Sequence, residues 1–231
     1  MIEAQNLSKT YNGVTVLNIE NLVVNTGESI GLAGNNGAGK TTFFSLLLDL
    51  IGPTTGKITN NGIVVNQSES WKPFTAAFID ETFLIGYLTA EEYFYFIGDL
   101  RGQSKSQIDE FLAPFAEFFN DEILNKRKYL RDLSKGNQKK VGIIAALIGK
   151  PEVVVLDEPF ANLDPTTVSR LKRILKEIAS DPNRTLLVSS HDLQHTVEVC
   201  KRIVVLEKGV IVKDTPTTTE TLKELETFFE V

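Results

Sequence analysis

The chain has 231 residues, of which 42% are hydrophobic and 23% are charged. These values are ordinary for a folded globular protein and exclude a disordered or fibrous chain. The net charge of −6 leaves no excess of positive charge for neutralising phosphates, so we expect no nucleic-acid partner. The length suits one large domain, or a core domain that carries a smaller insert.

The compartment is indicated by the cysteine content and the N-terminal sequence. A single cysteine, Cys200, cannot form a disulfide within the chain, which fits a reducing cytosol. The first residues lack the basic and apolar stretches of a signal peptide, and no window approaches the roughly 18 apolar residues that span a bilayer. We therefore expect a cytoplasmic protein that reaches a membrane only by docking onto another subunit.

The N-terminal third predicts a β subdomain followed by a strand, a loop and a helix. Residues 2–32 alternate apolar and polar side chains and are interrupted at Asn12-Gly13 and Thr26-Gly27, which is typical of short antiparallel strands. The apolar run Ile30–Ala33 leads into a glycine-rich loop. The apolar residues between Thr41 and Ile51 then predict a buried helix, because no Pro or Gly interrupts them.

The middle of the chain predicts short strands and then a helical insert. Pro53, Gly56 and Gly62 divide the next segment into turns and short strands, and residues 76–79 form an apolar run that predicts a core strand. From Thr89 onward, aromatic and aliphatic residues recur at helical spacing over about sixty residues. This segment is therefore predicted to be a largely helical insert.

The last third alternates strands and helices. Residues 153–156 and 203–206 are apolar runs, and residues 186–190 begin with one, as found in parallel strands that are buried on both faces. Helical patterns at residues 166–179 and 193–200 lie between them, so the sequence predicts a mostly parallel sheet in an α/β fold. We interpret the chain as one domain, with residues 1–81 and 143–231 as the core and residues 82–142 as the helical insert.

A phosphate-binding loop is the clearest motif. Gly34–Thr41 fits the pattern G-x-x-x-x-G-K-[ST] and lies between a predicted strand and a predicted helix, where such a loop belongs. The glycines let backbone N–H groups curl around a phosphate, Lys40 adds a positive charge, and Thr41 offers a hydroxyl to Mg²⁺. An ordinary glycine turn is the weaker alternative. The nucleotide-binding residues predicted here are Asn35, Asn36, Gly37, Ala38, Gly39, Lys40, Thr41 and Thr42.

Two acids follow the apolar run of residues 153–156. Asp157 and Glu158 stand at the carboxyl end of this strand, where ligands of open α/β sheets bind. Asp157 is predicted to orient Mg²⁺, and Glu158 to polarise the attacking water as a general base. An acid pair alone is more often a solvated turn or a helix cap, but the upstream phosphate loop favours the catalytic interpretation.

Between these motifs lies Leu133-Ser134-Lys135-Gly136-Asn137-Gln138, which resembles the LSGGQ signature of the ABC ATPase family. Its Lys and Asn resemble the variant found in many exporters. The resemblance implies a P-loop NTPase core of the RecA-like type, with ATP and Mg²⁺ as ligands. It also implies that Ser134 and Gly136 bind the γ-phosphate of ATP held by an opposite subunit. In isolation, a Ser helix cap beside a Gly would be the simpler interpretation.

Further residues match the family pattern over nearly the whole chain. Tyr11 matches the aromatic residue that stacks on adenine, and Val16 is placed in the same nucleotide-binding set. Residues 161–164 match the loop that crosses the dimer interface, and His191 matches the histidine that contacts the γ-phosphate. Taken singly, Tyr11 would be a surface tyrosine and His191 a structural histidine.

One position departs from the family. The glutamine expected before the helical insert is absent, and Asp80 in Ile79-Asp80-Glu81-Thr82 is aligned with it. A carboxylate can help to hold Mg²⁺ through water but lacks the donor group of an amide, so Asp80 is predicted as a metal residue whose coupling role differs.

The resemblance implies the ATP-hydrolysing subunit of an ABC transporter, more often an exporter, which pairs head to tail with a second copy or a homologue. It would sit on the inner face of the membrane through a permease, with residues 83–96 as a candidate docking surface, although buried helix core is the better explanation for most of these aromatics. A non-transport ABC ATPase in a regulatory, translation or repair role is the alternative, and a kinase or GTPase that shares only the phosphate loop would lack the signature and His191.

Overall fold

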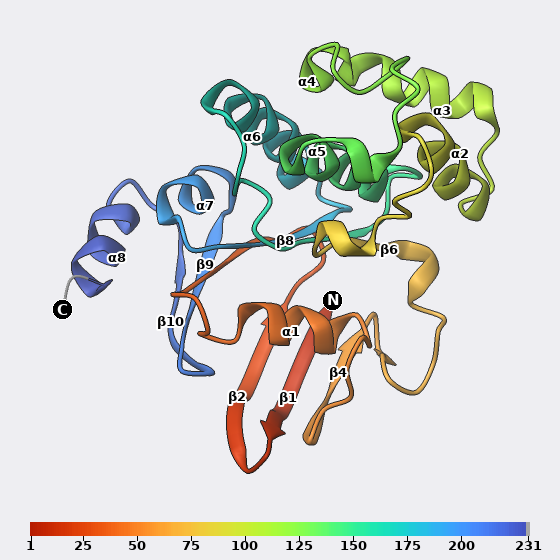
Figure 1. The fold of residues 1–231 in the computed structure, drawn as a ribbon. Coiled ribbons are helices and arrows are strands. Elements are labelled where there is room, and N and C mark those ends of the chain that lie inside the picture. Colours follow the sequence, from red (N-terminus) through yellow and green to blue (C-terminus); the bar gives the residue numbers. More distant parts are fainter. Residues whose placement is uncertain (230–231) are drawn as a thin grey trace.

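Two stacked β-sheets and the helices around them make up residues 1–229, the part of the chain that the computed structural model describes (Figure 1). One sheet has four strands in the order β2-β1-β4-β5, and the other has six in the order β10-β9-β3-β8-β7-β6. The strands are β1 (Ile2–Tyr11), β2 (Val14–Val24), β3 (Ser29–Ala33), β4 (Thr55–Asn60), β5 (Ile63–Val64), β6 (Thr75–Phe78), β7 (Val153–Leu156), β8 (Thr185–Ser190), β9 (Arg202–Glu207) and β10 (Val210–Pro216).

The helices lie mainly on one side of the six-stranded sheet, with α1 between the two sheets (Figure 1). The α-helices are α1 (Lys40–Leu47), α2 (Ala90–Leu100), α3 (Lys105–Leu112), α4 (Ala116–Phe119), α5 (Lys135–Leu147), α6 (Pro165–Ser180), α7 (Leu193–Val199) and α8 (Thr221–Phe229). Short 3₁₀ helices are η1 (Lys72–Phe74), η2 (Glu81–Phe83), η3 (Ala113–Phe115) and η4 (Leu130–Asp132).

The antiparallel β subdomain is confirmed. β1 pairs antiparallel with β2 on one side and with β4 on the other. The turn between β1 and β2 places Asn12 and Gly13 at φ 50° and 80°, the left-handed conformations that a tight hairpin requires. Apolar residues of β1 are buried as predicted, since Ile2, Ala4 and Leu7 are each 1% exposed or less; the strict alternation is interrupted at Asn6, where φ is 46°.

The parallel sheet is also confirmed, and its side chains supply two cores. β3, β6, β7, β8 and β9 run parallel, while β10 is antiparallel to β9. Along β7, Val153 and Val155 pack with α1 and the antiparallel sheet, whereas Val154 and Leu156 pack with the helices of the opposite face. This alternation explains why the strand is apolar throughout, because both of its faces are covered.

The helices follow the predicted pattern with small differences at their ends. The helix predicted between Thr41 and Ile51 is α1, which ends at Leu47 because the chain turns at Asp49, where φ is 53°. α6 begins at a cap in which Asp164 accepts the N–H of Thr167 at 3.0 Å. Its buried residues recur every three to four positions, as expected for an amphipathic helix.

The helical insert contains α2 to α5 and lies on the far side of the six-stranded sheet from α1 and the antiparallel sheet (Figure 1). α2 starts with a capping box formed by Thr89 and Glu92. The predicted boundary at residue 142 falls inside α5, which is one continuous helix from Lys135 to Leu147, so α5 belongs to the insert at its start and packs on β6 further along. The division into core and insert stays a prediction.

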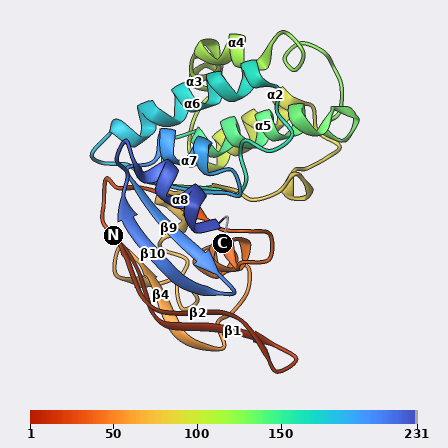
Figure 2. The same cartoon turned by 90° about the vertical axis from the view of Figure 1, so that its left-hand side faces the viewer.

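Two C-terminal elements were not predicted. β10 and α8 lie beside β9 and α7 on the face turned to the viewer in Figure 2. β10 is half exposed along its length, so it lacks the continuous apolar run by which the other strands were found. Among residues 1–229, no helix has the length and apolar character that a bilayer crossing requires.

Candidate nucleotide-binding site

The predicted motifs meet at one edge of the six-stranded sheet. β3, β8, β7 and β6 are neighbours, and the first three end directly before the phosphate loop, His191 and Asp157, respectively. Because parallel strands end on the same edge, residues far apart in the sequence are brought together there. A hydrogen bond from Asp157 N–H to the carbonyl of Phe78, at 2.9 Å, continues the contact between β7 and β6 into the site.

A cavity of about 340 Å³ opens at this edge. It is lined by most of the residues predicted to bind nucleotide, together with the predicted base; they are Tyr11, Val16, Asn36, Gly37, Ala38, Gly39, Lys40, Thr41, Thr42 and Glu158. Asn35 lies beside it and turns its carbonyl toward Lys40 Nζ. Tyr11 is 47% exposed where it borders the cavity, and Lys9 Nζ lies 4.8 Å from the centroid of its ring.

The phosphate loop has the backbone that its glycines permit. Gly37 and Gly39 adopt φ 82° and 108°, which side-chain-bearing residues rarely adopt, and α1 begins immediately after Gly39. Lys40 is only 6% exposed, and its Nζ donates to the carbonyl of Gly34 at 2.6 Å. The ammonium group is thus held inside a loop whose N–H groups belong to a helix N-terminus, which is an anion-binding arrangement.

Asp157 lies at the floor of the site and is 4% exposed. Its Oδ2 accepts the hydroxyl of Thr41 at 2.6 Å, and its Oδ1 accepts the hydroxyl of Ser189. Burial raises the pKa of the Asp157 carboxyl, while these two hydrogen bonds act in the opposite direction.

The oxygen atoms of Thr41 and Asp157 fit a hard cation. Mg²⁺ prefers oxygen ligands and usually takes only one or two from a protein, the rest coming from phosphate and water. A hydroxyl and a carboxylate in direct contact supply such a pair. The described residues contain no cluster of three or more His, Cys, Asp or Glu side chains, so a metal held entirely by such a cluster is not indicated within residues 1–229.

Glu158 faces the loop from the end of β7. Its Oε1 lies 3.4 Å from Lys40 Nζ, and its Oε2 lies 2.8 Å from Nδ1 of His191. The His191 side chain is 54% exposed, so it stands at the mouth of the site rather than in the core. The structure therefore brings the predicted base and the predicted γ-phosphate contact into one hydrogen-bonded pair.

Ser134 and Gly136 stand apart from this cavity. Ser134 is exposed and caps α5, since its hydroxyl accepts the N–H of Asn137 at 3.2 Å. Gly136 lies against the loop of residues 161–164: a Cβ built at this position would be 3.1 Å from the carbonyl of Asn162. The signature segment is therefore at the surface, beside the predicted interface loop, and does not line the cavity of its own chain.

Asp80 uses its carboxylate locally. It accepts the N–H of Thr82 at 2.7 Å and so caps η2, and hydrogen bonding by Thr82 lowers the pKa of this carboxyl. The described contacts include no hydrogen bond from Asp80 to Thr41 or Asp157. Its assignment to the metal stays a prediction.

Three residues at the site were not identified from the sequence. Ser189 donates to Asp157 and accepts the N–H of Glu158 at 2.9 Å, and its signal in the sequence is only that it directly follows the apolar run of β8. Lys139 reaches the site by donating to the carbonyl of Glu158 at 2.9 Å, and Glu81 forms an ion pair of 3.6 Å with Lys139. Their spacing in the sequence gives no indication of that contact.

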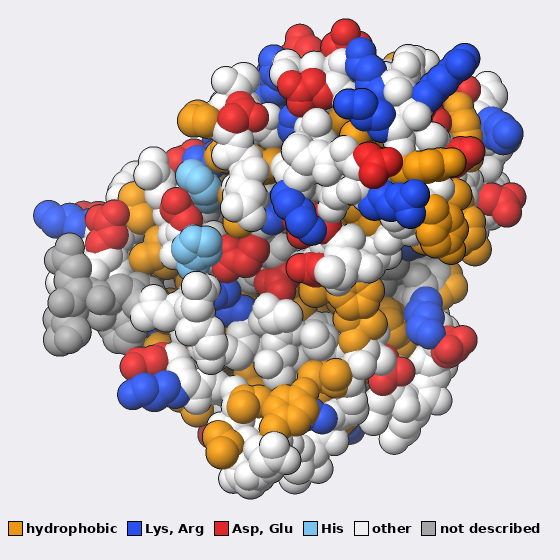
Figure 3. All heavy atoms as spheres, viewed as in Figure 1, with side chains coloured by type: hydrophobic (Ala, Val, Ile, Leu, Met, Phe, Trp, Pro, Cys, Tyr) orange, Lys and Arg blue, Asp and Glu red, His pale blue; other side chains and the backbone are white. Residues whose placement is uncertain are grey.

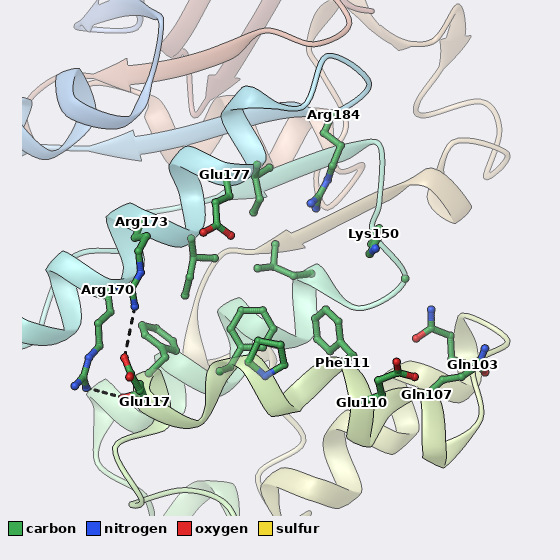
Figure 4. A pocket seen from close by; sticks show the side chains of 17 residues that line it. Gln103, Gln107, Glu110, Phe111, Glu117, Lys150, Arg170, Arg173, Glu177 and Arg184 are labelled. Carbon is green, nitrogen blue, oxygen red and sulfur yellow. Dashed lines mark hydrogen bonds and ion pairs between the residues drawn. The ribbon is translucent and has the colours of Figure 1, made fainter.

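A larger cavity, of about 780 Å³, lies elsewhere, between α3 and α6 (Figure 4). Arg170 and Arg173 reach from α6 across to Glu117, by a hydrogen bond to its carbonyl and an ion pair of 3.6 Å with its carboxylate. None of the predicted site residues lines it.

The fold and the site together define a P-loop ATPase. Its phosphate loop follows a central strand, its acid pair follows a second strand, and a histidine follows a third. The family model described as "ABC transporter" matches residues 17–161. The chain belongs to the ABC transporter family, in which it is an ATP-binding subunit and an ATPase.

Two curated relatives and one solved structure illustrate the similarity. The bacitracin transport ATP-binding protein BcrA of Enterococcus faecalis is 34% identical over 93% of this chain and 68% of its own length. The lipopolysaccharide export system ATP-binding protein LptB of Escherichia coli is 32% identical over 94% and 91%. The dimeric post-hydrolysis state of the ATP-binding cassette MJ0796, bound to ADP and Pi, is 23% identical with a TM-score of 0.83, covers 94% of this chain and 99% of its own, and shows a common fold.

Proposed function

We propose that this chain hydrolyses ATP with Mg²⁺ to drive transport through a separate membrane permease, and that two copies, or one copy and a homologue, close head to tail around the nucleotide. The observation that carries the proposal is the separation of two half-sites. The phosphate loop and Glu158 line the cavity, whereas Ser134 and Gly136 lie on the exposed N-terminus of α5, outside that cavity. A second chain can supply the missing half.

Within one chain, different side chains would bind the phosphates, the base and the metal ion. Lys40 and the N–H groups of the loop would bind the phosphates, and Tyr11 would stack on the base. Thr41 and Asp157 would hold Mg²⁺, which when bound neutralises phosphate charge. Ser189 keeps Asp157 oriented by its hydrogen bond, so the carboxylate oxygen that meets Thr41 is fixed.

Glu158 and His191 would perform the chemical step. The Glu158 carboxylate would accept a proton of the attacking water, and His191, whose Nδ1 contacts Glu158 Oε2, would donate toward the developing charge on the phosphate. The contact between Lys40 and Glu158 holds the carboxylate at the loop, which is the place where the γ-phosphate would lie.

An apolar surface beside the site fits an apolar segment of the permease. Phe83, Tyr87 and Leu100 are 59%, 69% and 68% exposed, and a groove of about 360 Å³ runs between α2, β6 and the end of α1. Figure 3 shows hydrophobic side chains gathered around α2 and the segment below it. Exposed clusters of this kind mark interaction sites. The chain would thereby work on the inner face of the membrane.

Export is the proposed direction. Lys135 in the signature is similar to the variant of many exporters, and the names of two relatives concern bacitracin transport and lipopolysaccharide export. Reconstitution with the permease in vesicles would test the direction, since accumulation of substrate on the ATP side would contradict export.

The proposed activity is tested by phosphate release from ATP. The purified chain is expected to hydrolyse ATP only with Mg²⁺, and Glu158→Gln is expected to lower the rate by at least about 100-fold because it removes the general base. Glu20→Gln, which changes an exposed acid on β2, is the matched control and should keep the wild-type rate. Equal rates for Glu158→Gln and the wild type would contradict the assignment of the base.

A further inference from the structure

Lys139 is a buried cation that joins the helical insert to the catalytic loop. It lies in the second turn of α5 and is 5% exposed. Its Nζ lies 3.6 Å from Oε1 of Glu81 and donates to the backbone carbonyl of Glu158 at 2.9 Å. A buried ammonium group is tolerated only with such partners, so the position of Lys139 is specified by both.

The backbone of Glu158 needs support. Its φ is 45°, in the left-handed region that costs energy for a residue with a side chain. Ser189 Oγ accepts its N–H at 2.9 Å, and Lys139 holds its carbonyl. The direction of the Glu158 carboxylate follows from this backbone, because the residue lies in a tight turn directly after Asp157. Lys139 therefore acts on the orientation of the proposed base without touching its carboxylate.

Glu81 connects this contact to the surface. It is the first residue of η2, which Asp80 caps, and its side chain is 13% exposed. Phe83, the last residue of the same short helix, is 59% exposed and borders the apolar groove beside α2. A displacement of η2 by a ligand on the groove would thus move Glu81, and with it Lys139.

α5 is also in tight contact with β6, the strand that leads into η2. A Cβ at Gly142 would lie 2.2 Å from the Phe78 ring, so only glycine permits this approach. Gly142 follows Lys139 by three positions and therefore lies on the same face of α5. Because of this close packing, Lys139 and the loop that carries Glu81 can move little relative to each other.

We propose that Lys139 is a positioning residue for hydrolysis: by bridging Glu81 and the Glu158 carbonyl, it sets the orientation of the base and makes that orientation sensitive to what binds at η2. The proposal rests on the proposed ATPase function. It assigns the link between the docking surface and the base to Glu81 and Lys139, in a chain where the side chain of Asp80 is engaged in capping η2.

The test compares Lys139→Met, Lys139→Arg and Glu81→Gln with the wild type in kcat, KM and ATP affinity. Lys139→Met is expected to lower kcat by about 10- to 100-fold, as expected for a misplaced catalytic group, with little change in the Kd for ATP. Lys139→Arg, which keeps the charge, should recover most of the loss. The Glu158 carbonyl still accepts the N–H of Ala161 at 3.3 Å, so this loop keeps a hydrogen bond in the variants.

Lys172→Met is the matched control, since Lys172 lies on α6, is 14% exposed and pairs with Glu198 of α7 at 2.9 Å. It should keep the wild-type kcat. The double variant Glu81→Gln with Lys139→Met should be no slower than Lys139→Met alone, because the two residues act through one contact. Thermal unfolding of each variant reports on the fold separately from the rate.

The outcomes separate the two proposals. Wild-type kcat in Lys139→Met, or a loss of ATP affinity that matches the loss of rate, would overturn the positioning role while leaving the ATPase function intact. Absence of Mg²⁺-dependent hydrolysis by the wild-type chain itself would overturn both. If Lys139→Arg were as slow as Lys139→Met, the charge would not be the cause and the bridge would be excluded.

Discussion

At the scale of the residue, the site is made of charges that are buried and paired. Lys40, Asp157 and Lys139 are each 6% exposed or less, and each has at least one polar partner within hydrogen-bonding distance. Removing one charged group leaves its partner buried without a hydrogen bond or ion pair, and this costs more free energy than the contact itself contributes. Single substitutions here are therefore expected to have large effects.

Lys40→Ala tests the phosphate loop. The substitution removes the charge that faces the phosphates, and a charge-assisted hydrogen bond contributes about 1.5–3 kcal/mol, so we expect the Kd for ATP to rise by at least about 10-fold. Isothermal titration calorimetry measures it. Lys57→Ala, at an exposed position on β4, is the control. Wild-type affinity in Lys40→Ala would exclude the loop as the phosphate site.

Asp80→Asn tests the predicted metal role. Asn caps helices as well as Asp does, so η2 should keep its cap while the negative charge is lost. If the carboxylate helps to hold Mg²⁺ through water, hydrolysis at limiting Mg²⁺ should fall and recover as Mg²⁺ is raised, and binding of nucleotide without Mg²⁺ should be unchanged. An unaltered Mg²⁺ dependence would show that Asp80 only caps η2.

At the scale of the element, sequence patterns identified the parts that depend on local signals. The phosphate loop, the buried strands β7, β8 and β9 and the amphipathic α6 have patterns that hardly depend on their neighbours. β10 and α8 carry weaker signals and were missed. The bridge through Lys139 could not be predicted, because it joins residues 58 positions apart that meet only when α5 packs on β6.

Gly142→Ala tests the packing of α5 on β6. The added methyl group would overlap the Phe78 ring, and overpacking of a tight core contact typically costs about 1–3 kcal/mol. We expect a lower Tm, measured by circular dichroism. Gly52→Ala is the control, since a Cβ there meets nothing within 4 Å. An unchanged Tm in Gly142→Ala would show that α5 can shift away from β6 without cost.

At the scale of the whole molecule, the arrangement of half-sites supports the proposed head-to-tail assembly. The cavity opens at an edge of the parallel sheet, whereas Ser134 and Gly136 lie outside it, at the N-terminus of α5 in the insert. Nucleotide bound at the phosphate loop would be completed by Ser134 and Gly136 of a second chain, so ATP would link the two copies. In the proposed mechanism, hydrolysis would remove the γ-phosphate and with it that link, and a permease would use the change for opening and closing.

The most direct measurement is the oligomeric state of Glu158→Gln in ATP and in ADP. This variant should bind ATP without hydrolysing it, so sedimentation velocity should show a dimer in ATP with Mg²⁺ and a monomer in ADP. Ser134→Arg, added to Glu158→Gln, should abolish the dimer by placing bulk at the shared phosphate while leaving ATP binding through Lys40 intact. If Glu158→Gln sedimented as a monomer at saturating ATP, or as the same species in both nucleotides, the head-to-tail arrangement would be wrong.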